Sequence, residues 1–118
     1  MSITPDPDQF TRFAAATDEG PVVMLNLITF QDRTEYAAYG AAVLALVAQQ
    51  GGRLLWHGEP QQTLIGDAEW DYVALVEYPS RRAFLDMVTA PEYQRIHQHR
   101  ESGIARTELI ACHPLATH

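Results

Sequence analysis

Apolar residues follow two kinds of pattern along this chain, and each kind predicts one type of element. Val22–Phe30 is a β-branched and aromatic run bounded by turn residues, which predicts a strand. In 32–50 the apolar residues instead recur every three or four positions, which predicts an amphipathic helix that Asp32 caps and Gly51-Gly52 ends. The two patterns alternate along the rest of the sequence.

The complete series is a short N-terminal helix followed by the order β-α-β-β-α-β. This order is typical of an α+β, ferredoxin-like fold, in which two helices cover one face of a four-stranded antiparallel sheet. We expect helices at 6–17, 32–50, 80–90 and 91–102, and strands at 22–30, 53–57 with 63–65, 70–78 and 104–112, with a bend or bulge at 58–60.

Two of the predicted strands, 22–30 and 70–78, are apolar on both faces. In the first of them, Met24 and Ile28 point one way while Leu25 and Leu27 point the other way. A strand of this kind lies in a sheet that is covered on both sides. Because 118 residues leave no second layer to cover the other side, we expect a homodimer that packs sheet against sheet.

Length and composition indicate one domain spanning 1–118, with its core at 21–112, a helical extension at 6–17 and a loose tail at 113–118. Hydrophobic residues make up 47% of the chain, which excludes disorder. A net charge of −7 argues against a nucleic-acid partner. With no signal peptide and no apolar run long enough to span a membrane, we expect a cytoplasmic protein without a membrane partner.

Several motifs together resemble a known family. They are the run PVVMLNLITF, the pair Gly51-Gly52, the segment EYPS at 77–80, and the segment PEY at 91–93 followed by Arg100. Over about residues 21–112 the chain is similar to the uncharacterised family called domain of unknown function 1330. The resemblance implies a ferredoxin-like fold of the dimeric α/β-barrel superfamily. That superfamily includes cofactor-independent monooxygenases, lactone isomerases, haem-degrading and haem-peroxidase members, and ligand-sensing domains, so fold alone selects no reaction.

Asn26 is the most unusual residue of the first strand, because it is polar among apolar neighbours. A buried amide without partners costs a few kcal/mol, about 1–3 in most proteins. Two interpretations follow: a structural hydrogen bond to a neighbouring strand or loop, or an amide that orients a ligand at the floor of a pocket.

A second group of candidates comes from the helices. Tyr93, His97 and Arg100 share one face of the predicted helix at 91–102, and Tyr39 lies on the apolar stripe of the helix at 32–50. With Asn26 they could line a pocket between the sheet and the helices. The alternative is a half-exposed helix whose polar groups only reach water.

We expect no metal and no other cofactor, although the sequence leaves open a single histidine as a proximal haem ligand. His97 and His99 point about 200° apart on a helix and cannot share an ion there. Phosphate loops and the serine-hydrolase and zinc-protease motifs are also absent.

The residues leave two functions open. One is a cofactor-independent enzyme that acts on a small apolar or aromatic molecule. The alternative is a non-enzymatic, small-molecule-binding or stress-related dimer that uses the same pocket. A structural module without a pocket is the third hypothesis.

Overall fold

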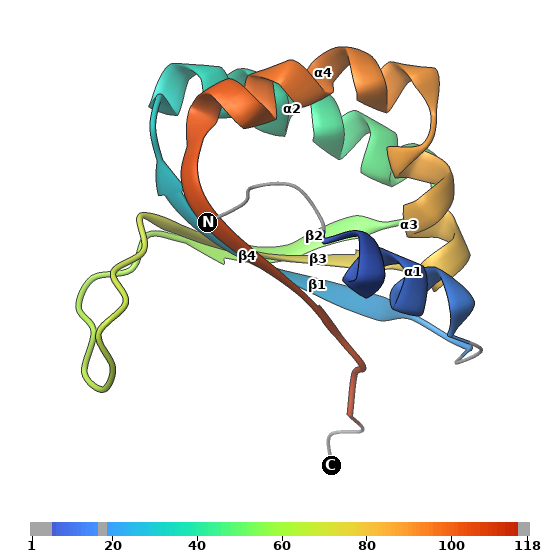
Figure 1. Cartoon of the computed structure of the whole chain (residues 1–118), viewed down its shortest axis with the longest axis horizontal. Coiled ribbons are helices and arrows are strands. Elements are labelled where there is room, and N and C mark those ends of the chain that lie inside the picture. The colour runs from blue at the N-terminus through green and yellow to red at the C-terminus, as the bar shows by residue number, and fades with distance from the viewer. Residues whose placement is uncertain (1–5, 17–18, 116–118) are drawn as a thin grey trace.

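The computed structural model describes residues 6–16 and 19–115, which form one sheet with helices on one side (Figure 1). The strands are β1 (Val22–Phe30), β2 (Arg53–Gly58), β3 (Tyr72–Tyr78) and β4 (Ile104–Cys112), paired antiparallel in the order β2-β3-β1-β4. The helices are α1 (Pro7–Ala15), α2 (Arg33–Gln49), α3 (Arg81–Val88) and α4 (Pro91–Gly103). The predicted ferredoxin-like fold with an extra N-terminal helix is confirmed. Position 17 of the predicted extension and 116–118 of the predicted tail lie outside the described residues.

Three helices begin with the side-chain caps that the sequence predicts. Oxygens of Asp6, Asp32 and Ser80 accept hydrogen bonds from backbone N–H groups two or three residues later, at 2.8–3.1 Å. Each cap of this kind stabilises a helix by about 1 kcal/mol. α4 starts without a side-chain cap, at Pro91, whose missing N–H and fixed φ suit the first helical position.

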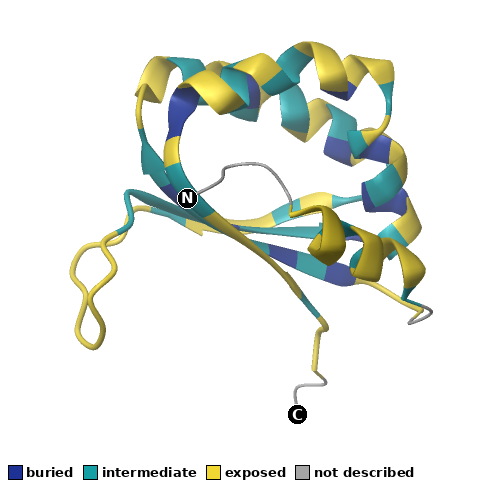
Figure 2. Ribbon diagram, viewed as in Figure 1, coloured by how far each residue is buried: buried dark blue, intermediate teal, exposed yellow. Residues whose placement is uncertain are grey.

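The core lies between the sheet and the helices, where Figure 2 shows most of the buried positions. Met24 and Ile28 of β1 are buried there, together with residues of α2 and α3 such as Val47 and Met87. On the opposite face of the sheet, no described helix covers the apolar side chains of β1 and β3 (Figure 1). In a single chain, this face of the sheet is therefore apolar and only partly buried.

The connection between β2 and β3 is a loop, so the predicted strand piece at Thr63–Ile65 is wrong. Leu64 is 84% exposed and Ile65 is 96% exposed, and neither belongs to a strand. The apolar run has the composition of a strand. Pro60 before it and Gly66 after it interrupt the extended conformation, so the run does not pair with a neighbouring strand. β3 also begins at Tyr72, two residues later than predicted.

The predicted irregularity of β2 lies elsewhere as well. The pairing of β2 with β3 shifts between Leu54 and Trp56, whereas we expected a bend at 58–60. As a result Leu54 pairs with Val76 on the helix side of the sheet, while Trp56 pairs with Leu75 on the uncovered side. The bulge thus adds a half-exposed tryptophan to the uncovered face.

α4 ends in close contact with the start of α2, and a glycine makes this approach possible. The Gly103 carbonyl accepts hydrogen bonds from the N–H groups of Gln31 and Asp32, at 2.8 and 3.2 Å. A Cβ atom added at Gly103 would lie 2.7 Å from the backbone nitrogen of Tyr36. Only glycine fits between the two helices at this point.

We therefore expect Gly103→Ala to lower the free energy of unfolding by about 1–3 kcal/mol, because the new methyl group must displace backbone atoms. Gly40→Ala is the matched control, since a Cβ at this helical glycine meets nothing within 4 Å. The control should gain up to about 1 kcal/mol from helix propensity. Urea denaturation measures both, and equal effects of the two substitutions would contradict the close approach.

Candidate functional site

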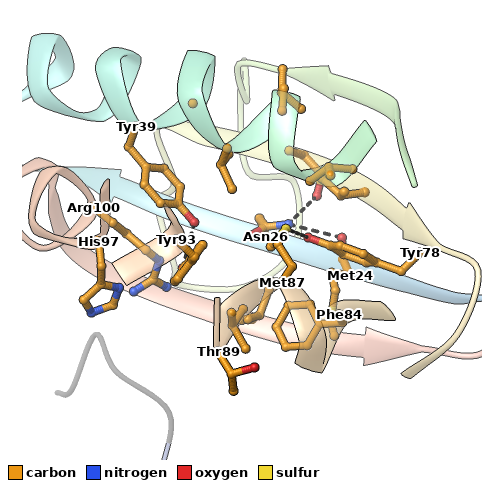
Figure 3. A pocket seen from close by; sticks show the side chains of 18 of the residues that line it. Met24, Asn26, Tyr39, Tyr78, Phe84, Met87, Thr89, Tyr93, His97 and Arg100 are labelled. Atoms are coloured by element: carbon orange, nitrogen blue, oxygen red, sulfur yellow. Dashed lines mark hydrogen bonds between the residues drawn. The ribbon is translucent and has the colours of Figure 1, made fainter. Parts of the chain in front are cut away.

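A cavity of about 560 Å³ lies between the sheet and the helices. β1 and β3 form its floor, and α2, α3 and α4 contribute to its walls (Figure 3). The first turns of α1 also line it. Its lining is mostly apolar and aromatic, with a few polar groups. The lining includes Met24, Asn26, Tyr36, Tyr39, Gly40, Tyr72, Ala74, Tyr78, Phe84, Met87, Tyr93, His97 and Arg100.

Two small residues leave room for this cavity. Ala74 pairs with Asn26 in the middle of the sheet, so one methyl group and one amide occupy the centre of the floor. Gly40 faces the cavity from the interior of α2, where glycine costs about 1 kcal/mol relative to alanine. Because a Cβ at Gly40 would meet no atom within 4 Å, packing does not require a glycine there. Its missing side chain adds volume to the cavity.

The structure brings all five predicted ligand-binding candidates to the lining of this one cavity: Asn26, Tyr39, Tyr93, His97 and Arg100. That they bind a ligand stays a prediction. Asn26 makes the hydrogen bonds of its structural interpretation, because its Nδ2 donates to the carbonyl oxygens of Met24 and Ala74 at 3.2 and 3.4 Å. No described residue donates a hydrogen bond to its Oδ1, which leaves one acceptor at the cavity floor.

All five tyrosines of the chain line the cavity. The hydroxyl groups of Tyr39 and Tyr93 lie 3.0 Å apart in a hydrogen bond, so one of the two keeps a proton that it can donate to a further acceptor. Burial raises the pKa of Tyr36, Tyr39 and Tyr78 well above the ordinary tyrosine value, and burial also raises the pKa of Tyr72. These hydroxyls are therefore neutral hydrogen-bonding groups at physiological pH.

The two ends of the cavity differ in chemistry, as Figure 3 shows. Phe84 and Met87 lie at one end, and the polar groups of α4, His97 and Arg100, lie at the other. Among the described residues, the lining includes no Asp or Glu, and Arg100 brings a positive charge to this end. The Arg100 charge acts against the burial that raises the pKa of Tyr39.

Three of the histidines each lie beside a different polar side chain. His97 Nε2 lies 2.9 Å from Glu101 Oε1, whereas His99 Nδ1 lies 2.6 Å from Glu35 Oε2 and ties α4 to α2. His57 Nδ1 lies 2.7 Å from the Tyr72 hydroxyl. Among the described residues, no three His, Cys, Asp or Glu side chains come together in a way that could hold a metal ion.

Sequence reasoning missed three contributions to the site. Gly40 was not among the candidates, although a glycine in the middle of a helix is itself a signal that something other than packing selects it. Glu101 follows His97 by four residues, a spacing that places both side chains on one helix face. The turns of α1 near Phe10 reach the cavity through folding alone, and no local pattern predicts that contact.

The fold and this cavity define the class of the protein, a ferredoxin-like α+β domain with an internal pocket. Residues 22–112 match the family described as domain of unknown function, DUF1330, and the chain belongs to that family. No curated protein matches the chain at a significant level. Within the described residues, no helix is both long and apolar enough to cross a membrane.

Solved structures with the same fold differ widely in how similar their sequences are to this chain. The chain is 35% identical to RPA0582 of Rhodopseudomonas palustris, a protein of unknown function, with a TM-score of 0.92 and 98% of each chain covered. SnoaB of Streptomyces nogalater, a cofactor-independent oxygenase, is 18% identical, with a TM-score of 0.62 over 83% of this chain and 96% of that one. A dimeric ferredoxin-like protein of unknown function from Bacteroides fragilis is 14% identical, with a TM-score of 0.56 over 80% and 96%. The two distant similarities show the fold alone.

We expect the stability of the fold to fall steeply above about pH 10. Burial raises the tyrosine pKa values in the folded state, so the unfolded chain loses these protons first as the pH rises, and unfolding becomes favourable. The chain has no lysine, so few other groups titrate there. The loss is about 1.4 kcal/mol per pH unit for each tyrosine that ionises only on unfolding.

Urea denaturation between pH 8 and 11, combined with the ultraviolet absorbance of tyrosinate, measures this effect. Tyr78→Phe should make the fall shallower by removing one of these groups. Tyrosinate absorbance that develops near pH 10 while the chain stays folded would contradict the buried environment.

Proposed function

We propose that this chain binds a small apolar or aromatic molecule in the cavity between sheet and helices. The observation that carries the proposal is the cavity itself, because interiors of small domains are normally close-packed, with few voids larger than a water molecule. A volume of about 560 Å³ lies within the usual range for ligand pockets. The lining also has the usual composition, aromatic and apolar walls with a few polar groups.

Gly40 strengthens this proposal. A leucine at this position would fill part of the cavity from α2, and α2 itself would not oppose it, because no atom lies within 4 Å of the new Cβ. The chain instead has the residue with the poorest helix propensity apart from proline. We infer that the space next to Gly40 is kept for a ligand.

Gly40→Leu should therefore weaken binding of an apolar aromatic probe, 7-methoxycoumarin, by at least about tenfold, a difference of 1.4 kcal/mol. Ala41→Leu adds the same side chain to the next residue of α2, which is exposed, and should leave the affinity unchanged. Fluorescence titration gives the dissociation constants. Equal binding by wild type and Gly40→Leu would show that the probe binds outside the cavity, and the proposal would fail.

We also propose that the chain is a homodimer that packs the uncovered faces of two sheets together. Leu25, Leu75 and Trp56 share this face by their register. The exposed Leu64 and Ile65 lie in the β2–β3 loop, which extends away from the helices and past this face of the sheet (Figure 1). Apolar patches larger than a few hundred Å² rarely stay uncovered. The dimeric protein from Bacteroides fragilis has the same fold, which supports the proposal.

Leu25→Asp should convert the dimer into monomers, because Leu25 lies on the central strand and a carboxylate there would be buried without a partner. Ala45→Asp introduces the same charge on the exposed surface of α2 and should leave the dimer intact. Sedimentation velocity at micromolar concentration measures both. A wild-type chain that sediments as a monomer would contradict the proposed interface.

A further inference from the structure

The side-chain amide of Asn26 has one orientation in the cavity floor. Its Nδ2 donates to two backbone carbonyl oxygens, that of Met24 at 3.2 Å and that of Ala74 at 3.4 Å (Figure 3). Carbonyl oxygens only accept hydrogen bonds, so a flipped amide would place Oδ1 against two other acceptors. The nitrogen is therefore tied to the sheet, and Oδ1 points away from those carbonyls.

Asn26 Oδ1 is an unpaired acceptor that is open to the cavity. The hydrogen bonds of this side chain within the described residues are the two that Nδ2 donates, so Oδ1 accepts none there. Two side-chain atoms of the described chain are buried without a partner, His97 Nδ1 and Arg106 Nε, and Asn26 Oδ1 is not one of them. Oδ1 therefore keeps accessible surface. Because Asn26 lines the cavity from the helix side of the sheet, this surface belongs to the cavity.

Apolar side chains surround this acceptor on the floor. Ala74 and Leu109 pair with Asn26 on the two neighbouring strands. Met24 and Ile28 precede and follow it by two residues on β1. A hydrogen bond is stronger in such surroundings, and an acceptor left without one is costly. An apolar ligand that displaces water from the floor would therefore leave Oδ1 unpaired unless it supplies a donor.

We propose that Asn26 selects ligands that carry a neutral N–H or O–H donor within an apolar body, as in a nitrogen heteroaromatic or a phenol. This inference rests on the proposed binding function of the cavity. The hydroxyls of Tyr39 and Tyr93 discriminate less, because a hydroxyl can donate or accept, whereas an amide oxygen only accepts. A cationic donor fits poorly, since the described lining includes no Asp or Glu that could pair with it. Asn26 is thus a specificity-determining residue.

Carbazole and dibenzofuran test the proposal. They have the same tricyclic shape, and they differ only in an N–H group that is replaced by an oxygen. The wild type should bind carbazole about tenfold more tightly than dibenzofuran, a difference of about 1.4 kcal/mol. Fluorescence titration of the protein into each probe gives the dissociation constants, and displacement of 7-methoxycoumarin shows that the probe occupies the cavity.

Asn26→Leu removes the acceptor with little change in side-chain size. The preference for carbazole should fall to less than about twofold in this variant. Any general effect of the substitution on the cavity cancels, because the two affinities are compared within one variant. Thr89→Val is the matched control. It removes a hydroxyl from another part of the lining and should leave the tenfold preference unchanged.

A spectroscopic test needs no variant and so does not depend on the folding of Asn26→Leu. Asn26 is the only asparagine of the chain, so labelling asparagine with ¹³C at Cγ gives one side-chain carbonyl signal. This signal should lie downfield in the carbazole complex relative to the dibenzofuran complex, as expected for an amide oxygen that accepts a hydrogen bond. The same chemical shift in both complexes would contradict the contact.

The possible failures are distinguishable. If 7-methoxycoumarin binds in the cavity but carbazole has no advantage over dibenzofuran, the role of Asn26 is wrong and the binding function stands. A preference for carbazole that persists in Asn26→Leu would likewise overturn the role of Asn26. If neither the tricyclic probes nor 7-methoxycoumarin bind to the wild type, the proposed binding function fails, and the selection by Asn26 fails with it.

Discussion

The structure depends on the alternation of side chains along β1, the strand that pairs with β3 on one side and β4 on the other. Successive side chains of a strand point to opposite faces, so Met24, Asn26 and Ile28 lie under the helices while Leu25 and Leu27 point to the uncovered face. A slip of one residue would exchange the two sets. One register therefore positions the floor of the cavity and the surface that we propose as the dimer interface.

The elements, and the place of the five candidate residues at the cavity lining, could be predicted because they depend on local periodicity. The alternation around Asn26 and the spacing of Tyr93, His97 and Arg100 require no knowledge of distant contacts. The loop and the bulge could not be predicted in this way. Leu64 and Ile65 look like a strand, and only the missing partner shows that they are not one. The shift in β2 occurs at Leu55, where no Gly or Pro indicates it.

The cavity lowers the stability of the fold in two ways. A void in the core loses dispersion contacts, and five tyrosines place hydroxyl groups in or near an apolar space. The hydroxyls of Tyr39 on α2 and Tyr93 on α4 form a hydrogen bond with each other, while the Tyr78 hydroxyl donates to Met87 Sδ at 3.9 Å. These three hydroxyls are thus held by neighbouring side chains rather than by bulk water, which lets the chain keep polar groups inside its core.

The break between α3 and α4 explains why the two ends of the cavity differ. α3 ends at Val88 and α4 begins at Pro91, so the two helices can take different directions over the same sheet. α3 supplies the apolar Phe84 and Met87, whereas α4 supplies the polar His97 and Arg100 (Figure 3). A molecule with an apolar body and one polar end would match this division, with its body under α3 and its polar end under α4. Two helices of different composition can in this way orient one bound molecule in the cavity.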